Sequence, residues 1–404
     1  MFFFGAESEC NMHTSAEMKK RNLRILFLLI LAITTLGSCR KQPAQRQQNA
    51  NSNAAVTQDT PVSGAATNGE RFYFRGTIAG NLRIEMTLLR DGERLTGTYF
   101  YPKVGKNIAL GGTIDKDGNV SISESEDSGK QTGVFKGKWK PATDSPDPTL
   151  SEIDGKWSRP DGSKETAFLV SQQPIEFTGA ARFAPKVIKE ASKEKHYGVD
   201  AEYPQIEGDA RFDKLNREAR SLVTKDVAAF KTAETSEPAS PDNVLADEAR
   251  ESSLDIGYQI RFATDDLISV EFTESTYEAG AAHPNSSTTV LNYDVKGGKK
   301  LSLGDLFNPK ANYLKTISDY CIKELKDRSK KDKDSMVDDD MMKSGASARA
   351  DNYKAWAITK KGLWITFDPY QVAAYAAGPQ YVLVPYSALK DLIKPDGPVG
   401  SFAK

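Results

Sequence analysis

The chain has 404 residues, with 54 lysine and arginine residues against 55 aspartate and glutamate residues, and a formal net charge of −1 at pH 7. A protein so close to neutrality lacks the basic stripe or patch that nucleic-acid binding requires, so we expect no nucleic-acid partner. The length exceeds what one hydrophobic core usually organises, which predicts two domains.

The N-terminal residues have the pattern of an export signal. Met18 is followed by a basic region, by an apolar stretch over residues 26–33 and by small residues before Cys39. This order is typical of a secretory signal peptide, and the apolar stretch is shorter than the roughly 20 residues of a membrane-spanning helix. We predict that translation begins at Met18 and that residues 1–38 are a signal peptide that is removed.

The segment Leu36-Gly37-Ser38-Cys39 resembles the bacterial lipobox. The resemblance implies a diacylglyceryl group on the sulfur of Cys39, so that the membrane is a partner through this residue. Two or three acyl chains, at about 0.8 kcal/mol per buried methylene, would hold the protein there. Arg40 in place of aspartate places the expected anchor on the outer membrane if the cell has two membranes. The alternative is an ordinary secretory signal in which Cys39 is incidental.

Cysteine and histidine usage argues against several kinds of site. Removal of Cys10 and lipidation of Cys39 would leave Cys321, so no intramolecular disulfide is expected. The mature histidines, His196 and His283, do not have the spacing of a zinc site. We therefore expect no metal and no cofactor, and we interpret Cys321 as a small buried apolar residue of a helix.

A change of composition separates a tether from the first domain. Residues 39–70 are rich in Gln, Asn, Ala, Thr and Ser and have little to bury, which predicts a disordered, lipid-anchored tether. Residues 71–172 are predicted to form a β-meander, because alternating segments are separated by Asp-Gly pairs typical of hairpins. The expected strands are 72–78, 82–89, 94–101, 108–114, 120–124, 131–139, 153–157 and 166–170.

The meander is expected to curl into a small barrel or a curled sheet. Glycines suit its tight bends, namely Gly97, Gly112, Gly133 and Gly137. A barrel can hold a ligand in its mouth. The alternative is an interior filled by side chains, for which we name Leu82, Ile84, Met86, Leu88 and Tyr99.

Residues 173–185 are interpreted as a linker and residues 186–404 as a second, α+β domain. Strands within 186–206 precede a helix over 210–233 with Asp209 as its N-cap. One face of this helix should lie on a sheet; its residues are Phe212, Leu215, Ala219, Leu222, Val223, Val227 and Phe230. The later elements are strands at 253–263, 267–277 and 288–295, a helix at 309–328, strands at 356–358, 363–367 and 381–385, and a short helix at 387–393.

The fold class is therefore α+β: an all-β meander followed by a domain with an antiparallel sheet and helices on one face. The charge-dense residues 326–343 include three consecutive aspartates from Asp338 to Asp340. They lack the alternating oxygens and the turn glycine of an EF-hand, so we expect a solvated, partly disordered insertion.

Four motifs of the second domain occur in an order that resembles a known family. They are Tyr203-Pro204-Gln205-Ile206 and the segments 280–285, 301–307 and 367–378. Over roughly residues 186–393 the chain resembles the extracellular domain shared by lysozyme-sensing anti-sigma factors of the RsiV type and the accessory region of PdaC-type peptidoglycan deacetylases. The resemblance implies an extracytoplasmic α+β module, which binds lysozyme in the RsiV type.

The sequence departs from both relatives in their effector parts. We find neither the sigma-binding segment and membrane span of the anti-sigma factor nor the aspartate and His-x-x-x-His metal pattern of the deacetylase. We therefore expect a noncatalytic envelope lipoprotein that binds a lysozyme-like hydrolase or a cell-wall glycan such as peptidoglycan. The alternatives are a cell-wall glycan hydrolase with Asp368 paired to Glu271 or Glu274 at about 5 to 9.5 Å, or a structural envelope component.

The candidate ligand-binding residues come from two of these motifs; they are His283, Asn285, Asp368, Tyr370 and Tyr375. A histidine in a loop can donate or accept, and aromatic rings with a polar edge suit sugar faces and protein hot spots. His283 could instead fix its loop through a backbone carbonyl. Tyr370 and Tyr375 could pack in the core while Asp368 caps the turn. No catalytic residue is expected.

Overall fold

The structure is a computed structural model that describes residues 69–143, 149–236, 251–331 and 336–404. The predicted signal peptide, Cys39 and nearly all of the predicted tether lie outside the described residues. Within these ranges no helix combines the length and the apolar character needed to cross a membrane.

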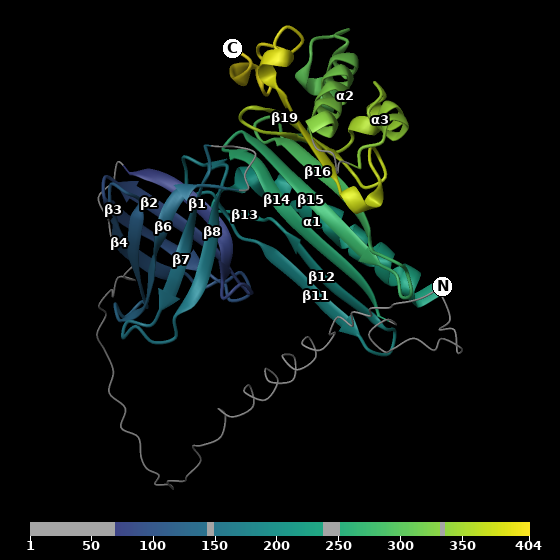
Figure 1. The fold of residues 1–404 in the computed structure, drawn as a ribbon. Coiled ribbons are helices and arrows are strands. Elements are labelled where there is room, and N and C mark those ends of the chain that lie inside the picture. The colour runs from purple at the N-terminus through teal and green to yellow at the C-terminus, as the bar shows by residue number, and fades with distance from the viewer. Residues whose placement is uncertain (1–68, 144–148, 237–250, 332–335) are drawn as a thin grey trace, which may run out of the picture. The chain divides into compact units, whose positions relative to one another are not determined.

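The first eight strands close into an antiparallel barrel (Figure 1). Each strand pairs with the next and β1 also pairs with β8, so closure removes the free sheet edges. All eight predicted strands are confirmed to within three residues at each end. They are β1 (Glu70–Ile78), β2 (Leu82–Asp91), β3 (Arg94–Phe100), β4 (Ile108–Ile114), β5 (Asn119–Ser125), β6 (Gln131–Pro141), β7 (Ser151–Ser158) and β8 (Thr166–Gln173).

Side chains fill the barrel interior. Ile84, Met86, Leu88 and Tyr99 are buried as predicted, but Leu82 is 48% exposed because it begins β2 at the end of the barrel. At each of the predicted glycines, other atoms of the barrel approach too closely to leave room for a Cβ. A Cβ on Gly112 would lie 2.1 Å from a carbonyl oxygen of the facing strand, so no larger residue fits there.

The second domain is built on a mixed sheet with the strand order β11-β12-β14-β15-β16-β17. The predicted antiparallel pairing of β14 (Ser252–Thr264), β15 (Leu267–Tyr277) and β16 (Asn285–Asp294) is confirmed, whereas β12 (Tyr197–Tyr203) joins β14 in parallel. The remaining short strands are β9 (Ile175–Glu176), β10 (Arg182–Phe183), β11 (Lys186–Ser192), β13 (Ile206–Glu207) and β17 (Lys299–Lys300).

The long helix packs on this sheet as its apolar face predicts. A 3-10 turn, η1 (Ala210–Phe212), leads into α1 (Asp213–Ser236), and the Asp209 carboxylate accepts the backbone N–H of Arg211 as N-cap. Every residue of the predicted face is buried except Leu222, which is partly buried against the same core. This core contains side chains from one face of β12, β14 and β15. A second layer contacts β14, β15 and β16.

That layer is a three-stranded antiparallel sheet with its own core. It consists of β18 (Trp356–Ile358), β19 (Gly362–Phe367) and β20 (Gln380–Pro385), and α2 (Tyr313–Lys331) packs on β20. Cys321 of α2 is fully buried as predicted, and burial raises the pKa of its thiol to about 12. The other helical elements are α3 (Asp339–Gly345) and the 3-10 turns η3 (Leu303–Leu306), η4 (Ala350–Tyr353), η5 (Tyr375–Ala377), η6 (Tyr386–Ala388) and η7 (Gly400–Phe402).

Buried polar groups join the two layers. The Ser269 hydroxyl donates to Asn292 Oδ1 at 2.6 Å, and the backbone N–H of Ile358 donates to both side chains. The Asn292 amide in turn donates to the carbonyl of Trp356 at 2.7 Å. These bonds fix the register of β18 on the larger sheet.

Two local predictions are wrong. Part of the charged insertion is the helix α3, because Asp338 accepts the backbone N–H groups of Asp340 and Met341 and the buried Met342 anchors the turn. Acidic side chains stabilise a helix N-terminus, which explains why this cluster orders. The short helix expected over 387–393 is only the 3-10 turn η6, followed by turns.

Charged side chains connect the barrel to the second domain within the compact unit Ala65–Lys404. Arg75 of β1 forms ion pairs with Glu85 at 3.1 Å and with Glu202 at 2.5 Å, and Arg83 pairs with Glu202 at 2.7 Å. The Arg75 guanidinium also donates to the Tyr258 carbonyl. Burial raises the pKa of the Glu85 carboxyl to about 7.

Candidate functional site

Two segments that are distant in sequence form an exposed aromatic cluster at one end of the second domain. The loop between β15 and β16 carries His283, and the chain between β19 and β20 carries Tyr370 and Tyr375. The His283 ring stacks on Tyr375 with centroids 3.7 Å apart and an angle of 21°. The ring of Tyr370 lies 5.5 Å from that of Tyr375. We call these three residues the aromatic surface.

Hydrogen bonds set the protonation pattern of the aromatic surface. His283 Nδ1 lies 2.9 Å from the Pro284 carbonyl oxygen, and Tyr375 Oη donates to the same oxygen at 2.5 Å. Because a carbonyl only accepts, Nδ1 carries a proton, and Nε2 lies 3.4 Å from Tyr370 Oη. The backbone interaction proposed for His283 therefore exists, and it coexists with an exposed ring.

The backbone holds Tyr370 outward at a conformational cost. Its φ is +69°, in the left-handed region, and its side chain is 57% exposed. The turn is fixed from below by Gln371, whose side chain accepts the N–H of Asp368 and donates to the carbonyls of Gly345 and Asn352. A tyrosine that neither packs in the core nor relaxes its backbone fits a contact role better than a structural one.

Asp368 lies under this turn. One carboxylate oxygen accepts the backbone N–H of Thr288 at 3.2 Å, whereas Oδ1 is buried and has no hydrogen-bond partner in the described part of the chain. Burial raises the pKa of Asp368, and the negative charge of Glu271 adds to the effect. The carboxyl therefore joins β16 to β19, as a capping group would.

Only one of the two predicted carboxylate pairs has its members on one face of the sheet. Glu271 faces β19 and accepts Thr366 Oγ1 at 3.3 Å, whereas alternation along β15 places Glu274 on the α1 side. Glu271 is 4% exposed and binds the Arg261 guanidinium through both oxygens, at 2.9 and 3.1 Å. Both oxygens of Glu271 therefore take part in a bidentate, charge-assisted pair.

Asn285 directly follows Pro284, whose carbonyl accepts from Tyr375. It begins β16, opposite Thr276, and is exposed. Within the described ranges no side-chain hydrogen bond links it to the aromatic surface.

The sequence prediction omitted a stack of side chains beside Asp368. The Arg261 guanidinium lies 4.5 Å from the centre of the Trp364 ring, and Trp364 stacks on Tyr381 with centroids 5.3 Å apart. Trp364 and Asp368 share one face of the strand because they are four residues apart. The alternation of β19 is the signal that could have identified this group, but the partners on β14 and β20 are decided by strand pairing.

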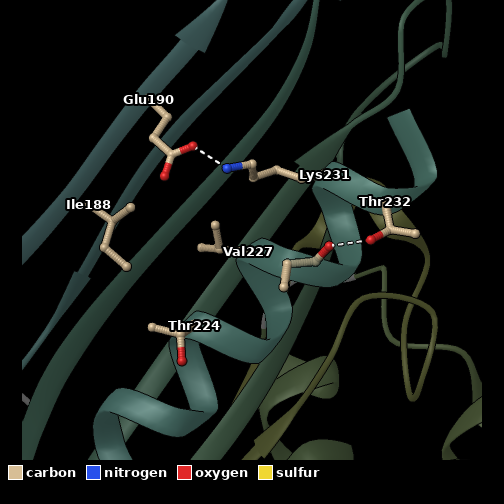
Figure 2. Close-up of a pocket in the computed structure, with 7 residues that line it drawn as sticks. Ile188, Glu190, Thr224, Val227, Lys231 and Thr232 are labelled. Atoms are coloured by element: carbon tan, nitrogen blue, oxygen red, sulfur yellow. Dashed lines mark hydrogen bonds and ion pairs between the residues drawn. The ribbon is translucent and has the colours of Figure 1, made fainter. Parts of the chain in front are cut away.

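A pocket lies elsewhere on the domain, between the edge strand β11 and α1 (Figure 2). It has a volume of about 470 Å³, and its floor includes Ile188 and Val227. Its polar groups are already paired within the chain: Glu190 with Lys231 at 2.5 Å, and the Thr224 hydroxyl with the Arg220 carbonyl. We therefore place the candidate site at the aromatic surface.

Two family models match the second domain of this chain. Residues 190–286 match the family described as deacetylase PdaC, and residues 304–387 match a family of unknown function, DUF3298. The first segment contains His283 and the second contains Tyr370 and Tyr375. These matches support a PdaC-type domain in the C-terminal half of the chain.

A curated relative and two solved structures are similar to parts of the chain. The peptidoglycan-N-acetylmuramic acid deacetylase PdaC of Bacillus subtilis is 28% identical over 200 residues, which are 50% of this chain and 40% of the relative. The chain thus spans less than half of that protein. A DUF3298-family protein of Bacteroides fragilis has 16% identity and a TM-score of 0.38, covering 57% of this chain and 99% of its own. One from Pseudomonas aeruginosa has 19% identity and a TM-score of 0.40, covering 53% and 94%.

Proposed function

We propose that this protein is a noncatalytic envelope protein that binds the glycan of the cell wall through the aromatic surface. The observation that carries the proposal is the exposed stack of His283 on Tyr375, with Tyr370 held outward beside it. Flat rings with polar edges complement the faces and hydroxyl groups of sugars. The ligand class is supported by the name of the Bacillus subtilis relative, a deacetylase of peptidoglycan N-acetylmuramic acid.

The noncatalytic part of the proposal is supported by the state of the carboxylates. Glu271 is neutralised by Arg261, and the free oxygen of Asp368 is buried. The hydrolase alternative makes a different prediction: the purified protein would release soluble fragments from peptidoglycan, and Asp368→Asn would abolish the release. A protein that binds peptidoglycan without releasing fragments agrees with our proposal.

A sedimentation assay with purified peptidoglycan tests the binding. The full chain in detergent should be retained, and Tyr370→Ala or Tyr375→Ala should weaken retention. Leu169→Ala is the matched control, because Leu169 is a comparably exposed apolar residue, 46% exposed, on the barrel. Equal retention of the tyrosine variants and the control would contradict the assignment of the site.

A lysozyme-like hydrolase is the second candidate ligand. Two of the four motifs that carry the resemblance to the lysozyme-sensing domain, residues 280–285 and 367–378, contact each other at the aromatic surface. Pull-down of a lysozyme by the full chain, weakened by Tyr370→Ala, would favour this candidate. If the wild-type protein and the Tyr370→Ala variant capture lysozyme equally, the aromatic surface does not bind lysozyme and this candidate is rejected.

We further propose that the protein is tethered to the outer membrane, or to the single membrane of the cell, by lipid on Cys39. Residues 39–70 would then let the folded part reach the wall at a distance from the bilayer. Labelling with radioactive palmitate should mark the wild-type protein and not Cys39→Ser. An unlabelled wild-type protein would refute the anchor without affecting the glycan assay.

A further inference from the structure

Tyr381 has the properties of a contact residue although no family motif singles it out. Its side chain is 37% exposed, and no described residue forms a hydrogen bond with its hydroxyl group. It stacks on Trp364, which is 8% exposed and whose ring also contacts the Arg261 guanidinium. Glu271 binds Arg261 through two hydrogen bonds, so the support of the ring is rigid.

The backbone under Tyr381 is fixed as well. Tyr381 pairs with Thr366 across β19 and β20, and the Arg328 guanidinium donates to its carbonyl at 2.5 Å. A rigid and partly exposed aromatic ring can bind with little loss of side-chain freedom.

The position of Tyr381 relates it to the aromatic surface. Asp368 directly follows β19 and is two residues beyond Thr366, the partner of Tyr381 on β20. At about 3.4 Å per residue, the backbone at Asp368 is about 7 Å beyond Thr366 along the chain. Tyr370 follows two residues later, so both aromatic contacts lie near the same end of β19. A strand of several linked sugars is long enough to contact both.

Two buried polar atoms without partners belong to β19 and to the residue that follows it. Within the described ranges, Trp364 Nε1 and Asp368 Oδ1 are both buried without a hydrogen bond. Such groups cost free energy and are uncommon in folded proteins. Their presence in the support of Tyr381 is not explained by stability.

We infer that Tyr381, supported by Trp364 and Arg261, forms a second sugar subsite that extends the aromatic surface, so that the protein favours long glycan strands over short ones. The inference rests on the proposed function. The aromatic surface would bind one part of the strand and Tyr381 a neighbouring part.

The test compares binding of peptidoglycan glycan strands of two and eight sugars to the full chain in detergent. The wild-type protein should bind the octasaccharide at least about tenfold more tightly, and Tyr381→Ala should remove most of this gain while leaving disaccharide binding unchanged. Tyr381→Phe keeps the ring and should keep most of the gain. Leu169→Ala is the control, and the thermal midpoint of each variant verifies folding.

The outcomes separate this inference from the proposed function. If the wild-type protein binds neither the disaccharide nor the octasaccharide, the proposed function fails and the inference fails with it. If the wild-type protein binds and Tyr381→Ala keeps the gain with length, only the second subsite is refuted. A separate stacking subsite would also be refuted if Tyr381→Ala weakened the binding of the disaccharide and the octasaccharide equally. The same holds if Tyr381→Phe weakened octasaccharide binding as much as Tyr381→Ala.

Discussion

Replacing Tyr370 by alanine and by glycine separates the contribution of its ring from that of its backbone. Both substitutions remove the ring, so both should abolish the contribution of Tyr370 to glycan retention. They differ in how well they tolerate the φ of +69° that the turn imposes. Alanine keeps the strain, whereas glycine relieves it.

The size of the difference follows from this geometry. The left-handed conformation costs a residue with a Cβ roughly 1–2 kcal/mol. Glycine loses more freedom on folding, by roughly 0.5–1 kcal/mol relative to alanine. The Tyr370→Gly variant should therefore be more stable than Tyr370→Ala by about 0.75 kcal/mol, the middle of a range of roughly 0–1.5 kcal/mol.

The nearby Ala374 provides the matched control for the backbone. Its φ of −60° is ordinary, so Ala374→Gly should lower the free energy of unfolding by roughly 0.5–1 kcal/mol. The change from alanine to glycine thus has opposite signs at the two positions. Urea unfolding midpoints at constant slope measure both differences. A Tyr370→Gly variant no more stable than Tyr370→Ala would refute the argument from strain.

Three further predictions concern the fold. Glu271→Gln should lower the free energy of unfolding by about 3–5 kcal/mol, because the Arg261 guanidinium, which is only 14% exposed, loses its carboxylate partner. A loss below about 1 kcal/mol in urea unfolding would contradict this. Gly112→Ala should lower the free energy of unfolding by about 1–3 kcal/mol, because the added Cβ would lie 2.1 Å from a backbone oxygen. Gly111→Ala is the control: its Cβ would meet no atom within 4 Å, so the free energy of unfolding should change by no more than about 0.5 kcal/mol. Equal thermal midpoints of the two variants would argue against a close-packed barrel wall. The pKa of the Glu85 carboxyl is raised from 4.5 to about 7, so between these pH values the folded state binds a proton that the unfolded state releases. The free energy of unfolding should therefore fall as the pH rises from 4.5 to about 7, and Glu85→Gln should remove this dependence. The same dependence in the Glu85→Gln variant would show that another group causes it.

Local patterns in the sequence predicted most elements. Alternation and Asp-Gly turns identified all eight barrel strands, because side-chain direction along a strand repeats every two residues in any fold. The periodicity of the long helix identified its buried face from Phe212 to Phe230. The same reasoning failed at Asp338, where the apolar residues that anchor α3 lie among charges and the pattern resembles a solvated loop.

The motifs pointed to His283, Tyr370 and Tyr375, and the structure brings these three side chains together. Their role in binding stays a prediction. Nothing in the sequence indicated that Tyr381 stacks on Trp364. The sequence also offered Glu271 and Glu274 equally as partners of Asp368. Alternation along β15 places them on opposite faces, and the pairing of β14 with β15 brings Glu271 to Arg261.

The sequence by itself determined the elements, the fold class and the kinds of residue available for a site, because these depend on short-range periodicity and turn chemistry. The tertiary structure alone decided that β1 pairs with β8, that His283 meets a tyrosine 87 residues away, and that Tyr381 rests on Trp364 and Arg261. Such contacts depend on the register and closure of strands that are distant in the chain. These contacts are stabilised by the packing of the whole domain, so the sequence of one short segment does not predict them.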